Sequence, residues 1–172
     1  MPRLRDWFFS LSETHPELRL ELFGGLILAT ILGGAIGWER EHSHKPAGLR
    51  TNILICMAAT LLTDISVRVA ASAEGPADPG RIAAQIVTGV GFLGAGTIMQ
   101  GQGIVTGLTT AATLWIVAAI GMAIGFGAVV EAVGTTLLAL TTLIPLRRLE
   151  GKEQYRRKAD VPPPDSARDG VK

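Results

Sequence analysis

Long stretches without any charged side chain constrain this sequence more than any other feature. Residues 22–38 and 82–130 contain no Asp, Glu, Lys or Arg, and most charges gather at the two ends and in the loop after Trp38. Charged residues make up 18% of the chain, against about 25% in an ordinary soluble domain. A soluble domain spreads charge over every exposed face, so this segregation indicates that lipid is the solvent.

The apolar stretches predict an all-α, polytopic transmembrane helix bundle of about five spans. The first span covers roughly 28 Å, which is close to the hydrocarbon thickness of a bilayer. Thr14 and Glu17 are spaced as a capping box ahead of this span, and Pro16 is tolerated in a first helical turn. The segment GQGIVTG is read as a short link between two spans that pack as a hairpin. The expected spans cover about residues 20–38, 52–70, 78–99, 108–125 and 127–146.

The Lys and Arg counts of the loops predict the orientation of the bundle. One side collects the cations of the loop after the first span and of the C-terminal tail, while the other side holds Arg3, Arg5, Arg19 and Arg81. We therefore expect the N-terminus outside and the C-terminus in the cytoplasm. Three regions follow: an interfacial segment at 1–19 without a cleaved signal peptide, the bundle at 20–146, and a basic, disordered tail at 147–172.

Small residues recur at helical spacing and predict where helices pack. In lipid, a stripe of Gly and Ala lets another backbone approach closely, whereas the alternative is that glycine is merely tolerated. The packing positions proposed on the first and third spans are Gly25, Ala29, Gly33, Gly37, Gly91 and Ala95. Their abundance favours self-association into a homo-oligomer. The single cysteine, Cys56, lies in an apolar run and is expected to pack in the core.

Polar residues at the edges of the spans are the functional candidates, because placing such groups in a bilayer is costly. The set comprises Glu39, Arg40, Arg50, Asn52, Arg81, Gln85, Thr109, Thr110 and Thr113. Two alternatives stay open. Glu39, Arg40 and Arg50 also suit a solvated cytoplasmic loop, and the threonine hydroxyls can bond carbonyls of their own helix. Glu39 and Arg50 are predicted to pair across the first two spans, and Thr109 and Thr113 to share a helix face.

Asp64 and Arg68 lie four residues apart in the second span and are expected to pair along one helix, with an ion site as the alternative. His42 and His44 lack the distant partners of a closed metal site. The run GVGFLG lacks the strand that a dinucleotide-binding loop needs. No activated nucleophile is visible, and the net charge of +1 gives no field for nucleic acid. We therefore expect no enzyme activity, cofactor, metal or nucleic-acid partner.

Four motifs occur in order along the chain: GGAIGWER at 33–40, AGLRTN at 47–52, DPGRIAAQIV at 78–87 continuing through GFLGAG at 91–96, and GLTTAATLW at 107–115. Together they resemble the MgtC/SapB family of membrane proteins over about residues 24–145. The polar positions carried over by motif are Glu39, Arg40, Arg50, Asn52, Arg81, Gln85, Thr109 and Thr110. Asp64 falls on no motif position.

The resemblance implies a multi-pass protein of the bacterial inner membrane, linked to growth in low magnesium and, in pathogens, to survival inside macrophages. It implies a non-enzymatic regulator of phosphate and ATP balance that binds other membrane proteins, including ATP synthase. The alternative is a transporter of magnesium or another solute, with the polar candidates lining its path. About 25 residues follow Leu146, too few for the packed cytoplasmic domain of longer family members, so we expect the membrane module alone.

Overall fold

The computed structural model describes residues 16–73, 78–101 and 104–159, with the backbone alone described at 16–19 and 145–159. This part of the chain forms five helices and one short hairpin of two strands. The all-α class predicted from the sequence is confirmed. The elements are α2 (Pro16–His42), α3 (Leu49–Ala71), α4 (Gly80–Thr97), β1 (Met99–Gly101), β2 (Ile104–Thr106), α5 (Leu108–Gly125) and α6 (Val129–Ala159).

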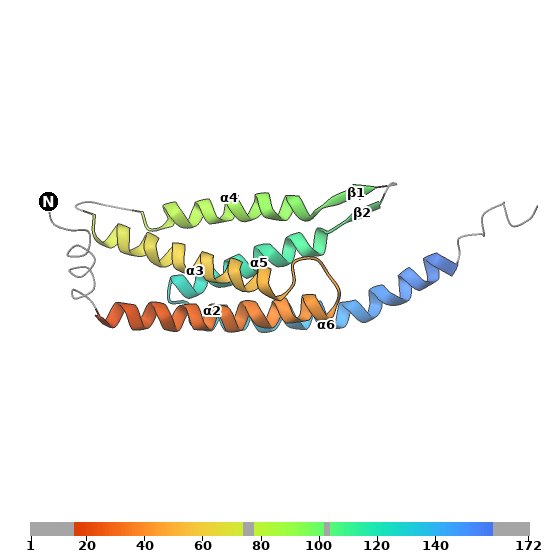
Figure 1. The fold of residues 1–172 in the computed structure, drawn as a ribbon, viewed down its shortest axis with the longest axis horizontal. Helices are drawn as coiled ribbons and strands as arrows, with labels where there is room; N and C mark the ends of the chain where they lie inside the picture. The colour runs from red at the N-terminus through yellow and green to blue at the C-terminus, as the bar shows by residue number, and fades with distance from the viewer. Residues whose placement is uncertain (1–15, 74–77, 102–103, 160–172) are drawn as a thin grey trace, which may run out of the picture.

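The helices lie side by side along the long axis of the molecule (Figure 1). Helices α2, α4 and α6 run in one direction, and α3 and α5 run in the other (Figure 1). Helices α3 and α5 are central, because α5 packs against each of the other four helices and α3 packs against α2, α4 and α5. The end that carries the α2–α3 loop and the two strands is called the hairpin end below. The end where α3 and α5 finish is called the cavity end.

Two apolar clusters hold the bundle together. The larger joins α2, α3, α5 and α6 through buried side chains that include Ile36, Cys56, Val117 and Ile120. The smaller joins α3, α4 and α5 around Ala59, Ile86, Val90, Leu114 and Ala118. Large apolar side chains also cover the outside, and Phe92 and Val130 are 79% and 82% exposed. Such a surface matches a lipid environment rather than water.

The described residues contain three helices that are long and apolar enough to cross a membrane, Leu20–His42, Leu49–Ala71 and Leu108–Gly125, and one shorter apolar helix, Val129–Ile144. The predicted span at 78–99 is a helix, but it does not meet this criterion. The physical reason is its composition: Arg81 and Gln85 lie near its start, and five of the 18 residues of α4 are glycine. The structure therefore supports three to four apolar candidate spans.

Two features differ from the sequence expectation: the segment between α4 and α5, and the end of α6. The GQGIVTG segment is not a plain link, because β1 and β2 pair antiparallel with Gln100 opposite Val105. Helix α6 also continues to Ala159, well past the start of the tail expected at 147, and this stretch is rich in Glu, Lys, Arg and other helix-forming residues. The remainder of that tail at 160–172, and the interfacial segment up to residue 15 with Thr14, lie outside the described residues.

Candidate functional site

Two polar side chains hold the α2–α3 loop at the hairpin end. Oε2 of Glu41 accepts a hydrogen bond from the backbone N–H of Leu49 at 2.9 Å, so its charge caps the first turn of α3. Nδ2 of Asn52 donates to the carbonyl oxygens of Ala47 at 2.5 Å and of Gly48 at 2.9 Å. Ala47 has a φ of 56°, a left-handed conformation that is unfavourable for alanine. The two hydrogen bonds from the Asn52 side chain therefore stabilise this strained turn.

Glycines bring α2 and α3 together beside this loop. A Cβ atom added at Gly33 would lie 2.8 Å from Cβ of Cys56, and one at Gly37 would lie 2.7 Å from Cα of Leu49. No larger residue fits at these distances without moving α3. The other proposed positions on α2 also face inwards, since Ala29 is fully buried and Gly25 contacts Ile124.

On α4 the structure differs from the expected packing positions. Gly91 and Ala95 are exposed, and nothing lies within 4 Å of a Cβ atom added at Gly91. Gly94 is buried instead, and a Cβ atom added there would lie 3.5 Å from Cβ of Ala111 of α5. The reason is that α4 is covered on one side only, and Ile86, Val90 and Gly94 make up the covered face at the i, i+4 spacing of a helix.

Sequence reasoning missed a close approach between α3 and α5. A Cβ atom added at Gly121 would lie 2.4 Å from the carbonyl oxygen of Cys56, and one at Gly125 would lie 2.6 Å from Cβ of Thr63. The signal was present in the sequence, because Gly121 and Gly125 repeat the four-residue spacing that was recognised on α2. Oγ1 of Thr60 ties the same interface together by donating to the Cys56 and Gly121 carbonyl oxygens, both at 2.9 Å.

A buried ion pair lies at the end of α2. The side chains of Arg40 and Glu39 are 3% and 9% exposed, and Nη1 of Arg40 lies 3.6 Å from Oε2 of Glu39. Ser43 donates to Oε1 of Glu39 at 2.6 Å. Arg40 is buried because it continues the inward stripe of Leu32 and Ile36 at four-residue spacing. The solvated-loop alternative therefore does not describe Glu39 and Arg40.

Several buried polar atoms at this end have unmet hydrogen-bonding capacity. Nε and Nη2 of Arg40 and Oδ1 of Asn52 have no hydrogen-bond partner among the described residues, although each is shielded from solvent. A buried polar atom lowers the stability of the fold unless it has a hydrogen-bond partner. Together with Oε2 of Glu39, these atoms present two donor nitrogens and two acceptor oxygens on neighbouring helices, next to the α2–α3 loop. This arrangement suits the binding of a polar group, and we take Glu39, Arg40 and Asn52 as the candidate functional site.

The remaining candidates at the hairpin end are divided between inside and outside. Arg50 is exposed, and the ion pairs among the described residues are Glu39–Arg40 and Asp64–Arg68. The predicted pairing of Glu39 with Arg50 is therefore wrong, because the first turn of α3 turns Arg50 outwards. Thr110 is buried and Thr109 is exposed, and Oγ1 of the buried Thr113 donates to the carbonyl oxygen of Thr109 at 2.7 Å. For Thr113 the alternative of bonding to its own helix applies.

Arg81 and Gln85 lie at the other end of the bundle. They occupy the first turns of α4, beside Ser66 and Ala70 near the end of α3. The polar residues proposed as one path are thus separated by almost the whole length of α3. Both Arg81 and Gln85 are exposed.

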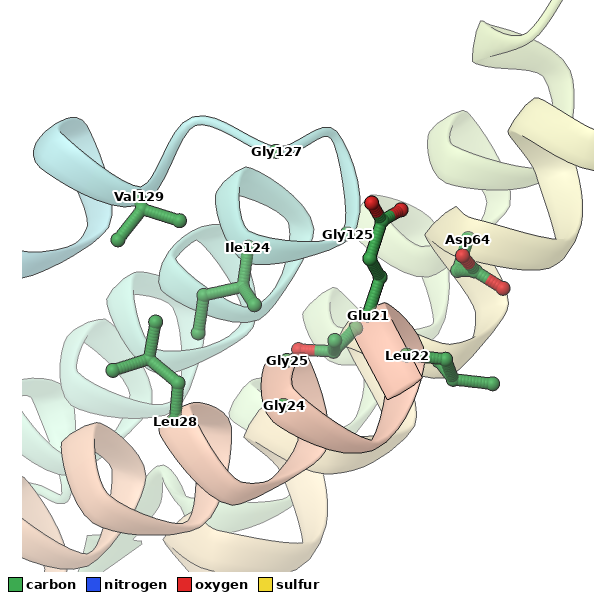
Figure 2. Close-up of a pocket in the computed structure, with 11 residues that line it drawn as sticks. Glu21, Leu22, Gly24, Gly25, Leu28, Asp64, Ile124, Gly125, Gly127 and Val129 are labelled. Carbon is green, nitrogen blue, oxygen red and sulfur yellow. The ribbon is translucent and has the colours of Figure 1, made fainter. Parts of the chain in front are cut away.

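A cavity of about 350 Å³ opens at the cavity end between α2, α3 and the α5–α6 turn. Glu21 and Asp64 carry carboxylates on one side of it, and Leu28, Ile124 and Val129 line the other side (Figure 2). The expected pair along α3 is present, because Nε of Arg68 lies 2.7 Å from Oδ2 of Asp64. Glu21 was not singled out from the sequence. An acidic residue just inside the first apolar span was the available signal.

Comparison with known proteins identifies the family. The MgtC family matches residues 26–152 of this chain. The chain belongs to the MgtC family. The match includes Glu39, Arg40 and Asn52 but begins after Glu21, so the buried site lies within the part common to the MgtC family.

Three relatives in the MgtC comparison are informative. An uncharacterised protein of Haemophilus influenzae is 41% identical over 148 residues, which are 80% of this chain and 62% of the relative. The putative magnesium transporter YhiD of Escherichia coli K12 is 52% identical over 106 residues, 59% of this chain and 49% of YhiD. Protein MgtC of Salmonella typhimurium is 45% identical over 122 residues, 71% of this chain and 51% of that protein.

This MgtC-family chain therefore spans about half to three fifths of the length of these curated relatives. No solved structure matches it. Family membership and the apolar helices together make it a multi-pass membrane protein.

Proposed function

We propose that this chain is a non-enzymatic regulatory module of the bacterial inner membrane, which acts through helix contacts with other membrane proteins. The close packing at the centre of the bundle carries the proposal. Gly33 and Gly121 bring α2 and α5 against α3 from two sides, and Cys56 between them is fully buried. A protomer packed this tightly offers its outer helix faces, rather than an internal passage, for interaction.

The outer face of α4 supports the same proposal. No described residue lies within 4 Å of Cβ atoms added at Gly89, Gly91 and Gly96, so this helix would present bare backbone to the bilayer. Such faces allow close helix association between chains. The proposed partners are a second copy of the chain and, from the family resemblance, ATP synthase. The proposed outcome is control of phosphate and ATP balance during magnesium-limited growth.

The orientation predicted from the sequence assigns the two ends of the bundle to the two sides of the membrane. Five membrane crossings, with α4 included, would place the hairpin end in the cytoplasm and the cavity end outside. The support is the excess of Lys and Arg in the α2–α3 loop and in the segment after Leu146. The candidate site at Glu39, Arg40 and Asn52 would then lie inside the bundle near its cytoplasmic end, beneath the α2–α3 loop.

A second candidate function is transport of magnesium or another cation. YhiD, a relative, is described as a putative magnesium transporter. In this chain, Asp64 and Glu21 line one cavity, and buried polar residues continue along α3 as Thr60, Thr63 and Asn52. Polar side chains also act as hydrogen-bonding links between helices, as Thr60 does, and this is why we rank transport second.

Reconstitution separates the two functions. The purified chain is placed in vesicles alone, and uptake of magnesium and of phosphate is measured separately. It is then placed in vesicles with ATP synthase, and ATP-driven proton pumping is recorded. The regulator predicts no flux and reduced pumping, with vesicles that contain an unrelated multi-pass protein as the control. Saturable magnesium uptake that is lost in Asp64→Asn and kept in Arg50→Gln would establish transport and reject the regulator.

A further inference from the structure

An apolar groove runs between α3 and α4 on the outside of the bundle. It has a volume of about 470 Å³ and is lined by Ile55, Ala58 and Leu62 of α3 and by Ile86, Gly89 and Leu93 of α4. The small residues Ala58 and Gly89 leave the space open, and nothing lies within 4 Å of a Cβ atom added at Gly89. An open apolar groove in a membrane protein faces acyl chains rather than water.

A polar cavity of about 600 Å³ adjoins this groove at the cavity end. Ile82 and Gln85 line both spaces, so the two lie next to each other along α4. The polar cavity is also lined by Asp78 and Arg81. Arg81 forms no ion pair with any residue that the structure describes, and Oδ1 of Asp78 accepts the N–H of Gly80 at 2.7 Å. One cation and one anion therefore lie together where the apolar groove ends.

The length of the groove matches one leaflet of a bilayer. From Ile82 to Leu93 the helix rises by about 16 Å, and half of the hydrocarbon core is about 15 Å thick. Arg81 stands one residue before this apolar length begins. A lipid whose acyl chain ends beside Leu93 would thus have its polar headgroup beside Arg81, at the level of the other headgroups.

We propose that this combined groove binds one phospholipid of the phosphatidylethanolamine type. One acyl chain lies in the apolar part, the guanidinium of Arg81 holds the phosphodiester, and the carboxylate of Asp78 attracts the headgroup ammonium. Arginine suits phosphate oxygens because its planar N–H donors match them in pairs. The lipid fills the space between α3 and α4, and so contributes to the position of α4.

Native mass spectrometry tests this proposal on the full chain released from detergent micelles. The protein is equilibrated with equal amounts of phosphatidylethanolamine, phosphatidylglycerol and diacylglycerol. We expect one retained lipid, with phosphatidylethanolamine retained most and diacylglycerol least. Arg81→Gln should reduce retention about tenfold, a change typical of losing one charge-assisted contact, whereas Arg50→Gln at the hairpin end should leave it unchanged. Equal retention of all three lipids would overturn the assignment of the headgroup site.

Two glycines of α4 provide a matched test of the groove itself. Gly89→Leu puts a side chain into the groove, whereas Gly91→Leu makes the same change on the same helix outside it, and neither position has a protein neighbour within 4 Å. We expect Gly89→Leu alone to abolish retention, with both variants monodisperse and equally helical. Equal retention in the two variants would refute the groove. A lower oligomeric state in Gly89→Leu with unchanged lipid retention would also refute it, because a second copy would then be the occupant.

Discussion

Nη1 of Arg40 lies 3.6 Å from Oε2 of Glu39, and both side chains are almost wholly buried at the end of α2. Neighbouring residues on a helix point about 100° apart, so the two side chains meet protein on different sides of α2. The pair is stable here because α2 ends against the α2–α3 loop, whose Ser43 also binds Glu39. The charge of Arg40 is thereby held inside the bundle while two of its nitrogens keep unmet hydrogen-bonding capacity.

Removal of the Arg40 side chain should lower the stability of the bundle. We expect Arg40→Ala to lower the free energy of unfolding by about 3 kcal/mol, because the Glu39 carboxylate is left buried without an opposite charge. Unfolding in mixed detergent micelles measures this, and Arg50→Ala, an exposed cation at the same end, should change it by less than about 0.5 kcal/mol. The double variant Glu39→Gln with Arg40→Met should lose less than the sum of the single changes. Additive losses would show that the two side chains do not interact.

Glycine-to-alanine changes should have opposite signs at Gly121 and Gly91. At Gly121 the added methyl meets the carbonyl oxygen of Cys56 at 2.4 Å, so we expect a loss of about 1–3 kcal/mol from overpacking. At Gly91 the methyl meets nothing within 4 Å, and alanine should stabilise α4 by up to about 1 kcal/mol. The same unfolding assay measures both. A loss at Gly91 comparable to that at Gly121 would mean that the exposed face of α4 is covered in the assembled protein.

Asn52 should control the order of the α2–α3 loop. We expect Asn52→Leu to cost about 1–3 kcal/mol, because the carbonyl oxygens of Ala47 and Gly48 lose their buried donor. Asn52→Asp should cost more, since it places a carboxylate against those oxygens. Protease cleavage between residues 43 and 48 reports the opening of the loop, with the exposed neighbour Thr51→Ala as the control. Cleavage that stays at the level of the parent chain would contradict this role.

Helix α4 should cross the membrane in spite of its low hydropathy. In a Cys56→Ser background, single cysteines are placed at Ala73, at Gln100 and at His44, all of which are exposed. We expect a membrane-impermeant maleimide to label position 73 in intact spheroplasts, and positions 100 and 44 only after permeabilisation. Labelling of 73 and 100 from the same side would remove α4 from the membrane-crossing set and leave four crossings or fewer.

Much of the fold was accessible from the sequence because lipid imposes simple rules. Apolar stretches predicted each of the five described helices, and the predicted ends fell close to the observed ends for α5 at Leu108–Gly125 but not for α6, which continues to Ala159. Helix α4 shows where the rule weakens. Its glycines reduce hydropathy without preventing helix formation, and the packing of α3 and α5 on one face supports the helix. The β1–β2 pairing depends on contacts between residues on two sides of a turn, which hydropathy does not report.

The site was predicted in part. Motif positions selected Glu39, Arg40 and Asn52, which the structure brings to one end, but they also selected Arg81 and Gln85, which lie at the other. Spacing along one helix predicted the Asp64–Arg68 pair correctly, because such pairs are local. The proposed pairing of Glu39 with Arg50 failed because it depended on how α3 is rotated about its axis. The capping role of Glu41 was missed because it depends on the path of the α2–α3 loop, which the sequence does not show.

The bare contacts of α3 with α2 and α5 have a mechanical consequence. At Gly33, Gly37, Gly121 and Gly125 no side chain of the glycine separates the helices, and this close packing favours movement of the three helices as one unit. A displacement of the α2–α3 loop would then move α3 as far as Ser66, whose hydroxyl donates a hydrogen bond to the carbonyl oxygen of Pro79 at the start of α4. Movement at one membrane surface would swing α4 at the other.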